Sequence, residues 1–446
     1  MSKKTSIQLS DHFTYQKLLR FTLPSIVMMV FTSIYGVVDG FFVSNYAGKT
    51  PFAAVNFIMP VLMIFGAVGT MFGSGGSALI AKTLGEGNQE KARELFSLLV
   101  YLSLGCGVAL AVLGLIFLRP VAALLGAEGE MLENCIVYGR IILLALPALM
   151  LQYEFQSFCV TAAKPHLGLA VTVAAGLANM VLDALLVAVF PIGIAGAALA
   201  TAISQCIGAV APLIYFARKN TSLLKLTRAE WDGAAVFKTC TNGSSEFLSN
   251  ISMSVVGMLY NVQLMKYAGE NGVAAYGTLM YVNMIFIAAF LGYSVGTAPV
   301  IGYHYGAGNH EELKGLLRKS LFIIGSCSVA MLAAAQLLAG SLARLFVGYD
   351  KELLDITLRG FFIFSFSFLF AGITILGSSF FTALNNGLVS AVIAFMRTLV
   401  LQVAAVLLLP LIWDLDGIWI SCVAAELFAM LITICFWAGC KKKYHY

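Results

Sequence analysis

"NYAGKTPFAAVNFIMPVLMIF", residues 45–65, recurs in altered form as "KYAGENGVAAYGTLMYVNMIF" at residues 266–286. The same offset of 221 residues pairs "GEGNQE" at 85–90 with "GAGNHE" at 306–311. It also pairs "TA" at 161–162 with "TA" at 382–383, and Gly196 with Gly417. A register that holds over this distance indicates an internal duplication. We therefore expect the chain to fold as two similar halves.

The composition identifies the medium in which the two halves fold. Hydrophobic residues make up 60% of the 446 residues and charged residues only 11%, whereas a soluble domain is about half apolar and about a quarter charged. The mean hydropathy is +0.90, and apolar runs of about 20 residues, enough to cross a bilayer as a helix, recur throughout. We predict an all-α integral membrane protein. The twelve predicted spans lie near residues 18–43, 52–81, 95–118, 135–158, 167–190, 193–216, 245–265, 273–303, 316–340, 358–381, 388–412 and 417–439.

Twelve spans divide into two parallel repeats of six. Because six is an even number, both halves have the same orientation and should be related by an axis along the membrane normal. The predicted domains are an N-terminal lobe (1–217), a polar, basic linker (218–239) and a C-terminal lobe (240–446). Two such lobes around a central cleft suit transport by alternating access.

The distribution of basic residues predicts how the chain is oriented. An even number of spans places both termini on one side of the membrane. If that side is the cytoplasm, nineteen Lys and Arg, Lys3 and Lys4 among them, fall on the inner side and seven on the outer side, as the positive-inside rule requires. The net charge of +5 then reflects contact with anionic lipid headgroups, and no nucleic-acid partner is expected.

Polar side chains in the first half form a candidate site. Asp39 lies in span one, Asp183 in span five and Thr201 in span six, all about 6–12 Å below the outer hydrocarbon edge at 1.5 Å per residue. Asn179 shares a helical face with Asp183, four residues away. An aspartate within a span costs about 2.5–3.5 kcal/mol, which points to function. Tyr35, one turn before Asp39 on the same face, is a candidate substrate contact.

The chemistry of this group suits a coupling ion. Two carboxylates close together in a low dielectric do not both remain ionised without a cation. Either they share a proton, or they bind a hard ion such as Na⁺ with the help of the Asn179 and Thr201 oxygens. The alternative is that each aspartate is a buried hydrogen-bonding group between helices. The positions that match Asp39, Asn179, Asp183 and Thr201 at the offset of 221 are Tyr260, Val400, Ala404 and Cys422. This asymmetry favours a site.

Three glutamates are further candidates for substrate binding. Glu154 falls on the cytoplasmic half of span four, Glu246 opens span seven, and Glu426 lies nearer the middle of span twelve. Each could attract a cationic substrate or pair with a cation, and Arg397 in span eleven is a candidate partner for Glu426.

Several stretches together resemble the multidrug and toxic compound extrusion (MATE) transporters. These are "VVDGFFVSNYAG", "GEGNQEKA", "NMVLD" and "GIAGAALATAISQ", with the second-half counterparts "YAGENGVAAYG", "YGAGNHEEL" and "LDGIWISCVAAE". The resemblance covers about residues 13–440 and is strongest to the bacterial DinF-like and MepA-like groups. It implies an antiporter in a bacterial inner or plasma membrane that exports organic cations and amphipathic drugs in exchange for H⁺ or Na⁺.

The resemblance also implies roles for particular residues. DinF-like members have an N-lobe cation or proton site built from an Asp on span one, Asn-x-x-x-Asp on span five and a Thr on span six. These positions map onto Asp39, Asn179, Asp183 and Thr201. NorM-like members use a C-lobe glutamate deeper in span seven, where Met253 lies nearer that depth than Glu246 does. In this respect the sequence departs from the NorM-like pattern.

A different transport function and an enzymatic function are the alternatives. A flippase or exporter of a lipid-linked or metabolic substrate is the alternative, but the intramembrane charges are mostly acidic, with Arg397 the exception, which favours cations. An enzyme is not expected, because no nucleophile–base group, metal motif or cofactor fingerprint occurs. We expect no cofactor besides H⁺ or Na⁺ as coupling ion. The expected partners are small cationic or amphipathic molecules and membrane lipids, and the two-lobe chain is expected to work as a monomer.

Overall fold

The computed structural model describes residues 7–348 and 350–446, and all regular elements in these ranges are helices. The first half contains α1 (Tyr15–Phe42), η1 (Val43–Ala47), α2 (Lys49–Gly85), α3 (Gln89–Leu124), α4 (Gly129–Leu144), α5 (Leu146–Thr161), α6 (Pro165–Asp183), η2 (Ala184–Val189) and α7 (Ile194–Ala217). The second half contains α8 (Gly233–Gly306), α9 (His310–Val347), α10 (Lys351–Phe364), η3 (Ser365–Ser367), α11 (Phe368–Ala383), α12 (Gly387–Phe395), η4 (Met396–Val400), α13 (Leu401–Leu408) and α14 (Pro410–Tyr444). The predicted all-α fold is confirmed.

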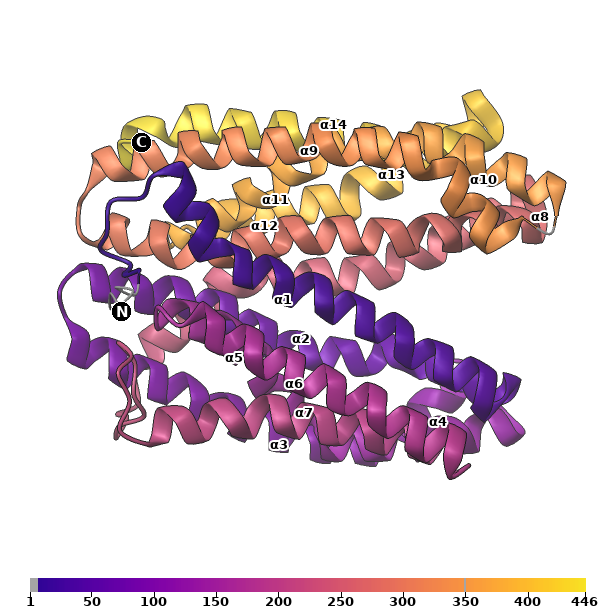
Figure 1. Cartoon of the computed structure of the whole chain (residues 1–446), viewed down its shortest axis with the longest axis horizontal. Coiled ribbons are helices and arrows are strands. Elements are labelled where there is room, and N and C mark those ends of the chain that lie inside the picture. Colours follow the sequence, from indigo (N-terminus) through magenta and orange to yellow (C-terminus); the bar gives the residue numbers. More distant parts are fainter. Residues whose placement is uncertain (1–6, 349) are drawn as a thin grey trace, which may run out of the picture.

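The two halves form two bundles that lie side by side, the first half below and the second half above in Figure 1. The first described residues and the C-terminus lie at the same end of the molecule (Figure 1), which we call the terminal end. This agrees with an even number of spans. Lys3 and Lys4, which entered the prediction of orientation, lie outside the described residues.

The described ranges contain the predicted twelve spans. Ten helices are long and apolar enough to cross a membrane, and α4 with α5 forms another span, bent by 57°. Helix α8 has 74 residues and would be about 110 Å long if straight. It breaks at Gly269, which has φ 61°, and the rings of Tyr260 and Tyr276 stack at 5.3 Å across the break. Helix α8 is therefore a hairpin of two spans.

The duplication is visible in the ends of the helices. Asn88 caps α3 by accepting the Lys91 backbone N–H, and Asn309 caps α9 in the same way. The residue before each cap is a glycine with positive φ, Gly87 at 83° and Gly308 at 66°. An asparagine cap satisfies an N–H group that the first helical turn leaves free. The offset of 221 residues thus matches equivalent turns in the two halves.

The offset is not constant along the chain. The left-handed residues that follow α5 and α11 are Ala163 and Asn385, both with φ 57°, and they are 222 residues apart. The predicted alignment of "TA" at 161–162 with "TA" at 382–383 is therefore wrong by one residue. The second half has one additional residue before this turn, so the register between the halves is close but not unbroken.

At the terminal end the two halves touch through their backbones. A Cβ atom on Gly85 would lie 1.9 Å from the Tyr303 carbonyl oxygen, and one on Gly306 would lie 2.0 Å from the Lys82 carbonyl oxygen. Each glycine thus meets the carbonyl three residues before the other, as in a self-complementary contact across a two-fold axis. Only glycine permits this approach of α2 to α8. The repeats are therefore related by a pseudo-two-fold axis at this contact.

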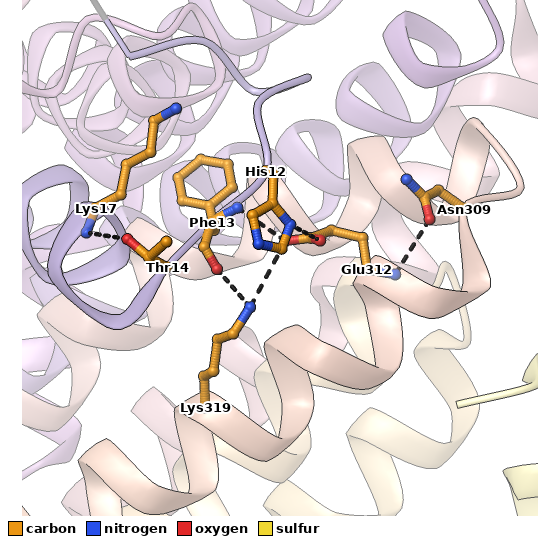
Figure 2. Close-up of polar contacts among 7 residues, drawn as sticks. All are labelled: His12, Phe13, Thr14, Lys17, Asn309, Glu312 and Lys319. Carbon is orange, nitrogen blue, oxygen red and sulfur yellow. Dashed lines mark hydrogen bonds and ion pairs between the residues drawn. The ribbon is translucent and has the colours of Figure 1, made fainter.

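A non-helical segment before α1 adds a polar link between the halves. The segment Leu9–Thr14, which we call the strap, lies against α8 and α9, and Figure 2 shows its contacts. Glu312 Oε1 accepts the Phe13 backbone N–H at 2.9 Å, and Glu312 Oε2 lies 2.6 Å from His12 Nδ1. Lys319 Nζ donates to the Phe13 carbonyl at 2.5 Å. The Phe13 side chain is fully buried, so the strap is packed as well as bonded.

A further hydrogen bond between the lobes also lies near the terminal end. Asn385, in the turn after α11, donates to the Ala78 carbonyl of α2 at 3.0 Å. This bond and the bonds of the strap are thus at or near one end of the molecule. The structure is closed at the terminal end.

The linker is attached to the N-lobe along its length. The Leu223 carbonyl accepts from Gln89 and Arg93 of α3, and the Thr227 backbone N–H donates to Ser97 Oγ at 2.8 Å. Asp232 pairs with a lysine of α3. The Ala235 backbone N–H and that lysine hold the pKa of Asp232 below its usual range. Helix α8 begins at Gly233, within the predicted linker, so the free stretch is shorter than 218–239.

Candidate functional site

The N-lobe brings the two predicted aspartates together. Asp39 lies in the last turn of α1, which packs against α6, and Asp183 is the last residue of α6. Their side chains are within electrostatic reach of each other, and two buried carboxylates this near to each other are not both stable as anions without a proton or a cation. Asp183 has no exposed surface and Asn179 is 2% exposed. This part of the site is therefore sealed from solvent.

The oxygens of the predicted site have no partners within the described protein. Buried atoms without a hydrogen bond include Asp39 Oδ1, both Asp183 oxygens, Asn179 Oδ1 and Thr201 Oγ1. Buried polar atoms are nearly always hydrogen-bonded, so an unpaired set calls for an explanation. Carboxylate, amide and hydroxyl oxygens are also the ligands that hard cations prefer. The arrangement can hold a proton or a small monovalent cation.

Tyr138 of α4 is a site residue that the sequence analysis missed. Its hydroxyl lies beside the Thr201 side chain and within electrostatic reach of Asp39 and Asp183. The side chain is only 1% exposed, and its hydroxyl also approaches Met59 Sδ at 3.8 Å. A tyrosine in a span carries no signal of this kind in the sequence, because neither spacing nor charge distinguishes it from a packing aromatic.

Tyr35 lies at the edge of the same group, as its spacing from Asp39 predicts. Its side chain is beside Gln152 of α5 and within electrostatic reach of Asp39. It packs over Gly176 of α6, where an added Cβ would lie 2.8 Å from the ring, and over Phe31, whose ring is 6.0 Å away. Residues of five N-lobe helices, α1, α4, α5, α6 and α7, thus lie at or beside the two acids.

The matching place in the C-lobe has its polar groups paired. Tyr260, which corresponds to Asp39 in the repeat, donates to Gln402 Oε1 at 2.7 Å. The Gln402 amide lies 3.9 Å from the sulfur of Cys422, which corresponds to Thr201. This neutral network has no need of an ion. The contrast supports a special role for the N-lobe acids.

The three glutamates lie in two separate places. Glu426 accepts Arg397 Nε on both carboxylate oxygens, at 3.0 and 2.9 Å, so the predicted pairing is confirmed. Arg397 sits in the π-helical turn η4, and Glu246 of α8 is half-buried within its electrostatic reach. Glu154 is in the N-lobe, where it has no exposed surface and neither carboxylate oxygen has a partner.

No group of three or more His, Cys, Asp or Glu that could hold a metal ion occurs in residues 7–348 and 350–446. The described acids of the spans therefore lie in pairs or alone. Pairs of this kind, in the interior of a membrane protein, mark ion pathways and proton relays.

Two six-helix lobes in parallel orientation, with buried acids inside them, define a membrane transporter built from repeats. A model of the MatE family matches residues 24–185 and again residues 247–407, one match in each lobe. The chain belongs to this family, the MATE transporters. The expectation of a transporter rather than an enzyme is confirmed by this membership.

Individual relatives agree with this assignment. The multidrug export protein MepA of Staphylococcus aureus is 25% identical over 427 residues, which cover 94% of this chain and 93% of the relative. An outward-facing multidrug resistance MATE transporter of the MOP superfamily has the same fold, with a TM-score of 0.93, 23% identity and full coverage of both chains. A MOP superfamily transporter from Pyrococcus furiosus matches with a TM-score of 0.92, 24% identity and full coverage.

Proposed function

We propose that this chain is a secondary active antiporter that exports organic cations and amphipathic drugs in exchange for H⁺ or Na⁺. The observation that carries the proposal is the set of buried, unpartnered oxygens on Asp39, Asn179, Asp183 and Thr201. Their environment favours a proton or a monovalent cation. The name of the Staphylococcus relative, a multidrug export protein, supports drugs as the exported substrates.

Alternating access is the mechanism that suits the contacts between the lobes. The strap and the Gly85–Gly306 contact close the terminal end, and the excess of Lys and Arg supports a cytoplasmic location for this end. The conformation described here then faces outward. Rocking of one lobe against the other would open the terminal end and close the opposite one.

Substrate recognition is proposed at residues near the coupling site and in the C-lobe. Arg397 neutralises Glu426, which leaves the half-buried Glu246 as an acid available to a cationic group. Tyr35 offers an aromatic face beside Asp39, and cations bind favourably to such faces. Glu154 has no exposed atom in this conformation, so substrate contact there would require the lobes to move.

The experiment is ethidium efflux from proteoliposomes under an imposed pH gradient or an imposed Na⁺ gradient. We expect one of the two gradients to drive efflux, and we expect Asp183→Asn to abolish it. The gradient that drives efflux identifies the coupling ion. Asp355→Asn is the matched control, because Asp355 is exposed on α10 and should have no effect. Full efflux in Asp183→Asn would reject the site, and no efflux of any organic cation under either gradient would reject the function.

The alternative is export or flipping of a lipid-linked or metabolic substrate. The Pyrococcus relative is a transporter whose binding pocket has reverse polarity, which suggests a different function for that protein. An anionic substrate would need an uncompensated cation in the membrane. The one intramembrane arginine predicted here, Arg397, is paired with Glu426, and this favours the cation exporter.

We propose a bacterial inner or plasma membrane as the location, with both termini in the cytoplasm and the protein working as a monomer. Labelling of a single cysteine introduced at the exposed position Lys314 tests the orientation. Membrane-impermeant maleimide should label it in inverted vesicles and not in intact cells.

A further inference from the structure

Glu154 is a buried acid for which the proposed coupling site has no use. It lies in α5 with no exposed surface, and neither of its carboxylate oxygens has a hydrogen-bond partner. An ionised carboxylate in such a place, with no cation and no donor, is strongly unfavourable. In the conformation described here, the side chain is therefore the neutral acid.

The surroundings of Glu154 contain no charge that would change this conclusion. Ser103 of α3 faces the carboxyl group, and Cys106, one turn further on, is within electrostatic reach. On the side of α2, the backbone of that helix packs closely against Glu154, since a Cβ on Gly73 would lie 3.0 Å from the Glu154 Cα. No Lys, Arg or His acts on Glu154 within the described chain. The titratable groups around it are thiols.

Helix α8 of the other lobe also lies near Glu154. Helix α8 contacts α5 directly, and Cys240 of α8 packs against the N-lobe cluster that contains Leu149 and Met150 of α5. Cys240 also acts electrostatically on Cys106. The same turns of α8 touch α2, because a Cβ on Gly243 would lie 2.0 Å from the Met71 carbonyl oxygen. The closed contact between the lobes thus lies beside the helices that bury Glu154, and we expect its separation to expose the carboxyl group.

From this geometry we infer that Glu154 is a second proton-binding site, separate from Asp39 and Asp183. Closing of the terminal end keeps this site protonated. Opening of that end moves α8 away and admits water, and the carboxylic acid then releases its proton to the aqueous phase there. Closing requires that the carboxylate takes up one proton from the same phase. The inference rests on the proposed alternating access, because it needs two positions of α8.

The test uses a disulfide that locks the terminal end. A Cβ on Gly302 would lie 3.1 Å from the Ala81 Cβ, a little below the separation of about 3.5–4.5 Å found in disulfides, so a small shift of α2 against α8 should let Ala81→Cys and Gly302→Cys form a cross-link. Infrared spectra of the protein in lipid then report the carbonyl band of protonated carboxyl groups. We expect one such band to be lost in Glu154→Gln and kept in the control Glu130→Gln, which changes an exposed acid of α4.

The cross-link separates the possible outcomes. In the reduced protein the Glu154 band should disappear at alkaline pH, and in the oxidised protein it should persist. No band lost in Glu154→Gln, or the same pH dependence with and without the cross-link, would overturn the inference. If Glu154→Gln does not fold, Ser103→Ala should shift the band, and an unshifted band would likewise overturn it. None of these readouts needs transport, so they can fail or succeed independently of ethidium efflux.

Discussion

Replacement of Glu312 by alanine removes the acceptor that fixes the strap to the C-lobe. The Phe13 backbone N–H, now bonded to Glu312 Oε1 at 2.9 Å, would be left buried without a partner. His12 would lose its contact with the same carboxylate, and Lys319 would keep only the Phe13 carbonyl. We expect the closed contact at the terminal end to weaken relative to the open one.

The size of the effect follows from the burial of each contact. The His12 side chain is 73% exposed, so solvent screens its ion pair with Glu312 and the pair contributes little to the closed contact. The Phe13 N–H bond to a charged acceptor is worth about 1.5–3 kcal/mol. Since about 1.4 kcal/mol is a factor of ten, the ratio of open to closed molecules should rise about 10- to 100-fold. Glu312→Gln keeps a neutral acceptor, so its ratio of open to closed molecules should fall between those of the unchanged protein and Glu312→Ala.

The distance between spin labels at Glu90→Cys and Lys314→Cys measures this ratio, because both positions are exposed at the terminal end. The control is Glu311→Ala, which removes the exposed neighbouring carboxylate and should leave the distances unchanged. Equal distance distributions for Glu312→Ala and the unchanged protein would refute the reasoning. The exposed native cysteines to be replaced before labelling are Cys206, Cys327 and Cys435.

Arg397→Met should lower the free energy of unfolding by about 3–5 kcal/mol, because it leaves the Glu426 carboxylate buried and unpaired. The double variant with Glu426→Leu should recover most of this loss, and thermal melts of both variants measure the difference. Gly306→Ala should open the terminal end in the spin-label assay, since its Cβ would lie 2.0 Å from a carbonyl oxygen of α2. Gly257→Ala, which meets nothing within 4 Å, should not. Tyr138→Phe removes the hydroxyl beside Thr201 and should raise the ion concentration for half-maximal efflux about fivefold, as expected if this hydroxyl supports the bound ion by about as much as one hydrogen bond; an unchanged value would contradict its place in the site.

The sequence predicts the two-lobe fold well because duplication preserves the residues that begin and end helices. Asn88 and Asn309 are visible as a repeated motif and prove to be equivalent caps. The contact of Gly85 with Gly306 was not predictable in the same way. A repeated glycine indicates an equivalent position in each half, but only the packing of the lobes decides that the two positions face each other.

For the site, depth along a helix can be counted from the sequence but rotation about the helix axis is harder to fix. Counting placed Asp39, Asp183 and Thr201 at one level, and the structure brings the two aspartates together. Counting along the helix did not predict that the Glu154 side chain is buried in the N-lobe core. The apolar residues of that span lie on all sides of the helix, so no polar stripe indicates which face is buried. Tyr138 was missed for the same reason.

The attachment of the linker to α3 decides which covalent part of the chain can bend. A segment bonded at Leu223, Thr227 and Asp232 travels with the first lobe as a rigid extension and offers no slack. Any tilt of one lobe against the other must then be taken up by the few peptide bonds around Gly233. In mechanical terms the covalent connection between the lobes is a short pivot rather than a tether, and under the proposed alternating access it would fix the point about which the two bundles swing.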